Sequence, residues 1–194
     1  MKLRIIHCMI VISLAIMCLN GCYYFQPPYN NFHISNRSAA FIASRSTKPA
    51  IIKKLQQQDI QFVQHGATMT LIVPTDKYYV FDTPKLNDIC YPGLVNIIRL
   101  LKQYPNSRIY VAGFTDDIGA PRFKQKLSQA RAEAMLTFLW ANDIDARRLN
   151  AEGYGDKHDI AQNEIIHGSA QNRRVEIQWF NAPLTTNRPC TYKK

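Results

Sequence analysis

The sequence predicts an α+β fold in which helices cover one face of a mixed β-sheet. Three observations lead to this prediction: strand-like and helix-like segments alternate along the chain, their apolar residues follow the matching periods, and no internal repeat is visible. The chain has 194 residues, of which 46% are hydrophobic, so we expect one packed domain with additional segments.

The folded part is expected to begin near Thr47, where a hydroxyl residue followed by Pro49 is typical of a helix start. The segments IQFVQHG (60–66) and TMTLIV (68–73) then alternate apolar and polar residues, and a glycine lies between them. This pattern predicts a β-hairpin. The segment YYVF (78–81) is interpreted as a further stretch of strand.

The second half of the chain alternates helices and strands. Its predicted segments are, in order, a helix at 84–103, a strand at 108–114, a helix at 121–142, a strand with a turn at 147–155 and a strand at 173–180. Pro92 and Gly93 weaken the first half of the first helix, so we expect that helix to begin late or to kink.

The N-terminus has the pattern of an export signal. Lys2 and Arg4 precede an almost continuously apolar stretch over 5–19, which is shorter than the ~20 residues of a membrane-spanning helix. The sequence LNGC that follows resembles a bacterial lipobox, which implies cleavage just before Cys22 and attachment of lipid to it. Tyr23 stands where lipoproteins of the inner membrane usually have Asp, which implies the outer membrane. The alternative is an uncleaved membrane anchor.

These features divide the chain into four parts: a lipoprotein signal peptide at 1–21, a lipidated N-terminus and flexible tether at 22–47, a folded domain at 48–182 and a C-terminal tail at 183–194. The tether mixes prolines, asparagines and aromatic residues without a helix or strand period. Cleavage would remove Lys2 and Arg4 but no acidic residue, so the formal charge would fall from +10 to +8. A basic chain attracts anionic polymers, but the export signal argues against nucleic acid as a partner.

The five cysteines agree with export. Cys8 and Cys18 lie in the signal and Cys22 would carry the lipid, which leaves Cys90 and Cys190. In an oxidising compartment these two either form a disulfide or stay unpaired, and the sequence leaves both alternatives open. No CxxC motif and no paired histidine spacing is present, so we predict neither a metal site nor a cofactor.

Four short motifs occur in order: GFTDDIG (113–119), LSQARAEAM (127–135), AEGYGD (151–156) and NRRVEI (172–177). Their order and spacing resemble the OmpA-like peptidoglycan-binding domain, a family that includes periplasmic domains of outer-membrane porins, Pal lipoproteins and the wall anchor of the flagellar stator. The resemblance covers Val80 to Trp179, roughly half of the chain. It implies a two-layer β/α/β/α-β sandwich, a place in the periplasm and binding to peptidoglycan.

The ligand of this family is the diaminopimelate side of the wall peptide, whose free end carries an ammonium and a carboxylate on one carbon. A site for such a zwitterion needs one fixed anion and one fixed cation a few ångströms apart. The resemblance assigns these roles to Asp116 and Arg131, and the planar guanidinium of an arginine suits a carboxylate. Asp117 is expected to belong to the turn.

The resemblance implies further binding residues around this pair. They are Phe81, Asp82, Thr115, Lys124, Leu127, Asn172 and Arg174. Leu127 is equally consistent with a core position, and one of Arg173 and Arg174 is expected to be a solvated charge at the strand edge. Two departures from the family pattern concern specificity and affinity: Phe114 replaces a His or Tyr, and Lys124 replaces an Asn that often contacts the ligand.

No catalytic motif competes with a binding function, so we do not expect an enzyme. The sequence lacks G-x-S-x-G, H-E-x-x-H and a glycine-rich phosphate loop, and adjacent acids on one turn cannot flank a sugar bond. Two hypotheses remain: a lipoprotein that ties the outer membrane to peptidoglycan, or a structural subunit of an envelope machine. The chain length, lipobox and aromatic tether resemble outer-membrane lipoproteins of Dot/Icm type IV secretion systems, which implies partners in such a core complex.

Overall fold

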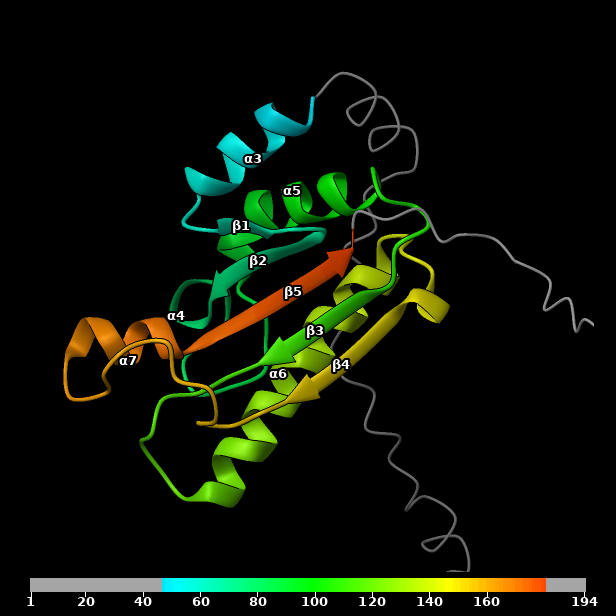
Figure 1. The fold of residues 1–194 in the computed structure, drawn as a ribbon. Coiled ribbons are helices and arrows are strands. Elements are labelled where there is room, and N and C mark those ends of the chain that lie inside the picture. Colours follow the sequence, from blue (N-terminus) through cyan, green and yellow to red (C-terminus); the bar gives the residue numbers. More distant parts are fainter. Residues whose placement is uncertain (1–46, 181–194) are drawn as a thin grey trace, which may run out of the picture. The chain divides into compact units, whose positions relative to one another are not determined.

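The computed structural model describes residues 47–180, which form a five-stranded sheet with helices packed against it (Figure 1). The predicted signal peptide, Cys22, the tether before Thr47, Cys190 and the tail lie outside the described residues. The strands are β1 (Gln61–His65), β2 (Thr68–Pro74), β3 (Ile109–Gly113), β4 (Leu149–Gly153) and β5 (Arg174–Phe180), in the spatial order β1-β2-β5-β3-β4. β3 and β4 are parallel and the other three neighbouring pairs are antiparallel, so the sheet is mixed, as predicted.

The predicted hairpin is confirmed. His65 at the end of β1 pairs with Thr68 at the start of β2, which leaves a loop of two residues. Gly66 in this loop has a φ of +59°, a left-handed conformation that glycine adopts without steric cost.

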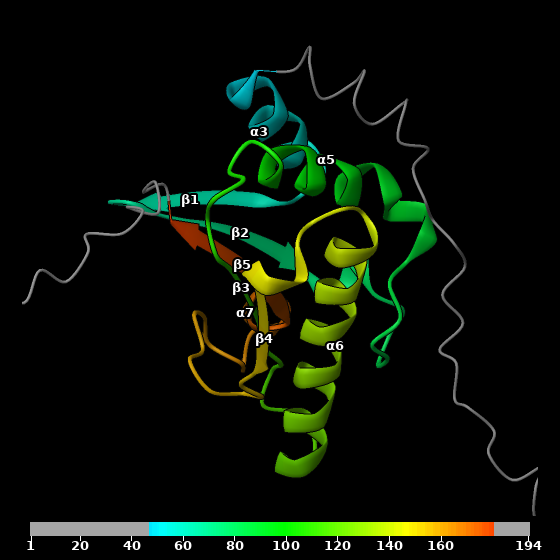
Figure 2. The same cartoon turned by 90° about the vertical axis from the view of Figure 1, so that its right-hand side faces the viewer.

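The helices α5 (Tyr91–Leu101) and α6 (Pro121–Ala141) cover one face of the sheet, and α3 (Lys48–Gln56) packs beside α5 (Figure 2). Alternate residues of each central strand turn toward these helices and are fully buried, for example Val111 in β3 and Ile177 in β5. This alternation is the pattern expected for a sheet with one covered face, and it confirms the predicted two-layer α+β fold.

Two glycines bring α6 unusually close to the ends of two strands. A Cβ atom at Gly113, the last residue of β3, would lie 2.1 Å from the backbone oxygen of Ser128 in α6. A Cβ atom at Gly153, the last residue of β4, would lie 2.2 Å from the backbone nitrogen of Gln129. The middle of α6 therefore contacts the strand ends directly, and this contact fixes where Arg131 lies relative to the loop after β3.

The interpretation of residues 78–81 as a strand is wrong. β2 ends at Pro74 and leads into a short helix, α4 (Thr75–Tyr78), and Tyr79 forms an isolated bridge rather than a ladder. Successive strand residues point to opposite faces, so one covered face can bury only every second side chain. Tyr78 and Tyr79 are adjacent and each is 1% exposed, which an irregular path allows and a half-covered strand does not.

Two further elements adjust the predicted boundaries. The helix predicted at 84–103 begins late, as expected, because a 3-10 turn, η1 (Asp88–Cys90), precedes α5. A second 3-10 turn, η2 (Ala146–Arg148), leads into β4. The helix α7 (Ile166–Asn172) was not predicted, since its seven residues carry no apolar stripe and include Gly168.

We expect Gly113→Ala to destabilise the domain. The new methyl group would collide with backbone of α6, which cannot move aside as a flexible side chain would. The expected loss is about 3 kcal/mol, at the upper end of overpacking effects, and urea denaturation followed by circular dichroism would measure it. Gly66→Asn is the matched control, because nothing lies within 4 Å of a Cβ atom there and Asn tolerates positive φ. Equal stability of both variants would contradict the proposed close contact.

Candidate functional site

The candidate site lies at one edge of the sheet, where several strand ends meet. The last residue of β2, Pro74, pairs with Arg174 at the start of β5, and the last residue of β3, Gly113, pairs with Val175 and with Gly153 at the end of β4. The segments that follow β2 and β3 or lead into β5 therefore converge there. These are α4, the GFTDDIG loop and α7.

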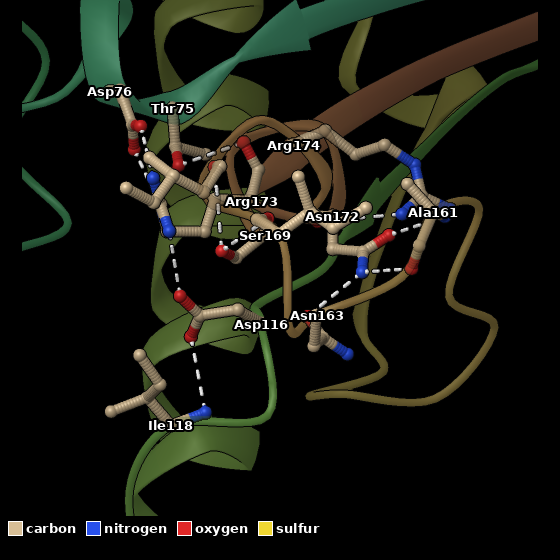
Figure 3. A network of polar contacts seen from close by, with 12 residues as sticks. Thr75, Asp76, Asp116, Ile118, Ala161, Asn163, Ser169, Asn172, Arg173 and Arg174 are labelled. Atoms are coloured by element: carbon tan, nitrogen blue, oxygen red, sulfur yellow. Dashed lines mark hydrogen bonds and ion pairs between the residues drawn. The ribbon is translucent and has the colours of Figure 1, made fainter.

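The two adjacent acids of the GFTDDIG loop differ in their surroundings. Asp116 is 8% exposed, and its Oδ2 accepts a hydrogen bond from Nη1 of Arg173 at 2.7 Å (Figure 3). Its Oδ1 accepts only a long bond of 3.4 Å from the backbone N–H of Ile118. Asp117 is exposed, and its backbone oxygen rather than its carboxylate is engaged, by Lys124. Asp116 is thus the oriented acid of the pair.

Arg173 bridges two carboxylates from distant parts of the chain. Besides Asp116, it holds Asp76 of α4 through two parallel bonds, Nε to Oδ1 at 2.7 Å and Nη2 to Oδ2 at 2.6 Å (Figure 3). The hydrogen bonds with Asp76 are the main reason why the pKa of Arg173 lies above its ordinary value, and burial partly opposes them. The expectation that one of Arg173 and Arg174 is a solvated charge at the strand edge is wrong, because both guanidinium groups are paired with carboxylates of the protein. Asp76 was not predicted, because no motif contains it.

Arg131 of α6 is 5% exposed and lies near this network. Its Nε donates to the backbone oxygen of Thr83 at 3.1 Å, and its guanidinium carbon lies 5.8 Å from the ring centroid of Tyr79. Burial lowers the pKa of Arg131, while electrostatic interactions with Tyr79, Asp82 and Asp76 oppose this decrease. Within residues 47–180, neither terminal Nη group of Arg131 makes a hydrogen bond, so both can bind a carboxylate.

A tight turn places Phe81 and Asp82 at the rim. The backbone N–H of Val80 donates to the oxygen of Lys85 at 2.8 Å, which closes the turn. Phe81 is 88% exposed, and Asp82 has a φ of +55°, a conformation that an L-residue rarely adopts. Leu127 is half-buried on α6, one turn before Arg131. The structure thus places these three residues near the Asp116–Arg131 edge without a direct bond to either charge.

Lys124 has a different place from the one that the family pattern implies. Its ammonium is buried and bonds Oδ2 of Asp156 at 2.5 Å and the backbone oxygen of Asp117 at 3.0 Å. The hydrogen bond from Lys124 is the main reason why the pKa of Asp156 is lowered. Lys124 therefore ties the start of α6 to two loops, and its charge is already used inside the protein.

Asn172 supports the loop that contains residues 160–163. Its Oδ1 accepts bonds from the backbone N–H groups of Ile160 and Ala161, and its Nδ2 donates to the oxygens of Ala161 and Asn163 (Figure 3). All the bonds that this fully buried amide can easily make are formed. Asn172 thus shapes the loop rather than facing a ligand.

Arg174 is 3% exposed and is part of a stack on the open face of the sheet. Its guanidinium lies 3.9 Å above the ring centroid of Phe114, and the other face of Phe114 stacks on Tyr154 at 5.4 Å. Arg174 also donates to Glu176 at 2.7 Å and to the backbone oxygen of His158. The aromatic ring at 114 is therefore held between an arginine and a tyrosine, which explains why a phenylalanine fits there.

Thr115 carries a buried hydroxyl beside Asp116. Its backbone N–H donates to Gly155 at 2.8 Å, but its Oγ1 is fully buried and lacks a hydrogen-bond partner among the described residues. A buried hydroxyl without a partner is costly, so a ligand or water molecule is the natural partner for this group.

The remaining observations concern the cysteines, metal ligands and membrane spans. Cys90 is half-exposed and its thiol donates to the oxygen of Lys77 at 3.1 Å, while Cys190 lies outside the described residues, so the disulfide stays a prediction. The part of the chain that the structure describes contains no group of three or more metal-ligating side chains. None of its helices is long and apolar enough to cross a membrane.

Comparison with known proteins assigns the fold to a family. Residues 78–173 match the OmpA family. The chain carries an OmpA-like domain. Outer membrane porin F of Pseudomonas aeruginosa is 37% identical over 108 residues, which are 55% of this chain and 31% of the porin. The probable lipoprotein YiaD of Escherichia coli is 31% identical over 124 residues, which are 64% of this chain and 57% of that protein.

A solved structure extends the likeness to the three-dimensional fold. The cell wall anchor of the T6SS from Pseudomonas aeruginosa shares 28% identity with a TM-score of 0.62, covering 70% of this chain and 98% of the anchor. The periplasmic domain of Helicobacter pylori MotB has the same fold, with a TM-score of 0.57 and 22% identity over 62% of this chain and 81% of that one. The chain matches less than two thirds of the length of the porin and of YiaD.

We expect Asp156→Asn to reduce the acid sensitivity of the domain. Because Lys124 depresses the pKa of Asp156 in the folded state, the pair adds stability above the unfolded-state pKa and loses it as the pH falls through the folded-state pKa. Between about pH 6 and pH 2.5 the wild type should lose about 0.5 kcal/mol more than the variant, a small value because the Asp156 side chain is 39% exposed.

Urea denaturation at several pH values would measure this difference. Asp88→Asn is the matched control, because Asp88 forms no ion pair within residues 47–180. An identical fall in stability for wild type and Asp156→Asn would contradict a stabilising role for the pair.

Proposed function

We propose that this protein is a non-catalytic outer-membrane lipoprotein that binds the diaminopimelate peptide of peptidoglycan and anchors an envelope assembly to the wall. One observation carries this proposal. Asp116 is an oriented, buried carboxylate with a nearly free Oδ1, and Arg131 is a buried guanidinium with two free Nη groups, at the same edge of the sheet. The likeness to a T6SS cell wall anchor supports the assignment.

The two charges suit the two ends of a zwitterion. In the proposed complex, the ligand ammonium donates to Oδ1 of Asp116, and the ligand carboxylate accepts from the Nη groups of Arg131. Hydrogen bonds between charged groups contribute about 1.5–3 kcal/mol each, and both groups are already held in place by internal bonds. Little ordering is therefore required when the ligand binds.

Neighbouring groups complete the proposed site. The unpartnered hydroxyl of Thr115 would bond a polar atom of the ligand. The exposed side chains of Phe81 and Ile118 would cover the apolar part of the ligand. Leu127 adds apolar surface, and Asp82 adds negative charge near Arg131. We assign supporting roles to Lys124, Asn172 and Arg174, because their polar groups are bonded within the protein.

The membrane anchor belongs to the proposal as well. Lipid on Cys22 would hold the chain in the outer membrane, and a flexible tether of ~25 residues has a root-mean-square reach of ~25–30 Å toward the wall. A role in a type IV secretion core complex rests on the resemblance of the lipobox and tether. The alternative function is a structural subunit of an envelope machine, in which the OmpA-like domain mainly contacts other proteins.

We expect Asp116→Asn and Arg131→Gln each to weaken binding to purified peptidoglycan sacculi about tenfold or more, since each removes one charge-assisted bond of about 1.4 kcal/mol or above. Co-sedimentation of the purified protein with sacculi would measure the affinity. Asp117→Asn and Arg122→Gln are the matched controls, because both residues are exposed neighbours on the same loop and helix. A wild-type protein that does not sediment would contradict wall binding and favour the subunit function.

We expect Cys22→Ser to abolish labelling of the protein with radioactive palmitate and to release it from the membrane fraction. The wild-type chain should be labelled and should fractionate with the outer membrane. Cys90→Ser is the control, because that cysteine lies in the folded domain. Palmitate incorporation that persists in Cys22→Ser would contradict the proposed anchor.

A further inference from the structure

Asp76 lies outside every motif of the chain but is bonded to the candidate site. It belongs to α4, next to Thr75, whose N–H and Oγ1 both donate to the backbone oxygen of Arg173 at 3.0 and 3.1 Å. These two bonds dock the end of β2 against the residue that precedes β5. The carboxylate of Asp76 is thereby held opposite the Arg173 guanidinium, which it engages through two parallel bonds (Figure 3).

The network of Asp76, Asp116 and Arg173 carries a net negative charge, although the Arg173–Asp116 pair alone would be neutral. Asp116 and Arg173 together are neutral, and a neutral pair attracts an ammonium poorly. Asp76 takes two of the three carboxylate bonds of Arg173 and compensates its positive charge. The three side chains therefore carry a net charge of −1, and the oxygen with spare capacity is Oδ1 of Asp116.

We propose that Asp76 is the charge-balancing residue of the site: by neutralising Arg173, it leaves Asp116 with an uncompensated negative charge that selects ligands carrying a free ammonium. This inference rests on the proposed binding function. Asp76 does not touch the ligand in this arrangement and acts only through Arg173. The site consequently favours a wall peptide with a free amine over one whose amine is acylated.

The bond pattern of Arg173 explains why a second acid is needed. Arg173 positions Asp116 with Nη1, which is a benefit, but the same guanidinium repels an incoming ammonium, which is a cost. Removal of Arg173 would abolish the repulsion together with the positioning. A counter-charge on the far side of the guanidinium abolishes only the repulsion, and Asp76 occupies that side through Nε and Nη2.

Binding of purified sacculi by Asp76→Asn tests the inference. The variant keeps the size of the side chain but leaves the charge of Arg173 uncompensated, so binding should weaken about three- to tenfold, as expected for one partly screened charge. Asp145→Asn is the matched control, because Asp145 also pairs with an arginine, the exposed Arg147, which lies away from this site.

The double variant Asp76→Asn/Arg173→Gln separates charge balance from simple support. It removes the uncompensated guanidinium together with the bond that positions Asp116, so charge balance predicts tighter binding than in Asp76→Asn but weaker binding than in the wild type. Simple support of the site would give no such gain from a second removal. Binding that stays as weak as in Asp76→Asn would overturn the inference, as would wild-type affinity in Asp76→Asn. Failure of the wild type itself to bind is a separate result, which overturns the proposed function.

Discussion

The contact between Thr75 and Arg173 holds together the two halves of the candidate site. Both hydrogen-bonding groups of Thr75 donate to one backbone oxygen, so the end of β2 cannot move independently of the start of β5. From this junction the Arg173 side chain reaches Asp76 on one side and Asp116 on the other. Two acids from different segments of the chain, Asp76 and Asp116, thus share one guanidinium, and the orientation of Asp116 depends on the whole sheet rather than on its own loop.

The sequence was sufficient to predict most of the sheet and the helices, because each element follows a simple rule. Alternation identified the hairpin and β3, and a long apolar stripe identified α6. The rule failed at Tyr78 and Tyr79, where two adjacent rings are buried and their hydroxyls bond distant backbone oxygens. Local periodicity contains no information about such distant acceptors, so the turn of α4 could not be predicted from it.

The candidate site, too, could be predicted from the sequence only in part. Asp116 and Arg131 belong to recognisable motifs, and their placement at one sheet edge follows from the contact of α6 with Gly113. Asp76 has no such motif, and the choice between Arg173 and Arg174 depends on which one lies before the strand and which one within it. Arg174 begins β5 and stacks on Phe114, whereas Arg173 precedes the strand and turns toward the acids. This distinction requires the exact start of β5, the feature that sequence patterns locate least well.

The hydrogen-bonding state of the buried polar groups separates scaffold from binding surface. The charges of Lys124 and Arg174 and the amide of Asn172 are fully engaged by protein groups, so they hold loops in place and offer little to a ligand. Within residues 47–180, Thr115 Oγ1 has no partner, Asp116 Oδ1 has one long bond, and the Nη groups of Arg131 have none. Thr115 Oγ1 and, in the core, Trp179 Nε1 are the described side-chain atoms that are buried without a partner, and such burial costs stability. Asp116 and Arg131 are largely buried residues that keep spare bonding capacity next to Thr115. A ligand that supplies one cation and one anion would use this capacity, and the zwitterionic end of a wall peptide has that composition.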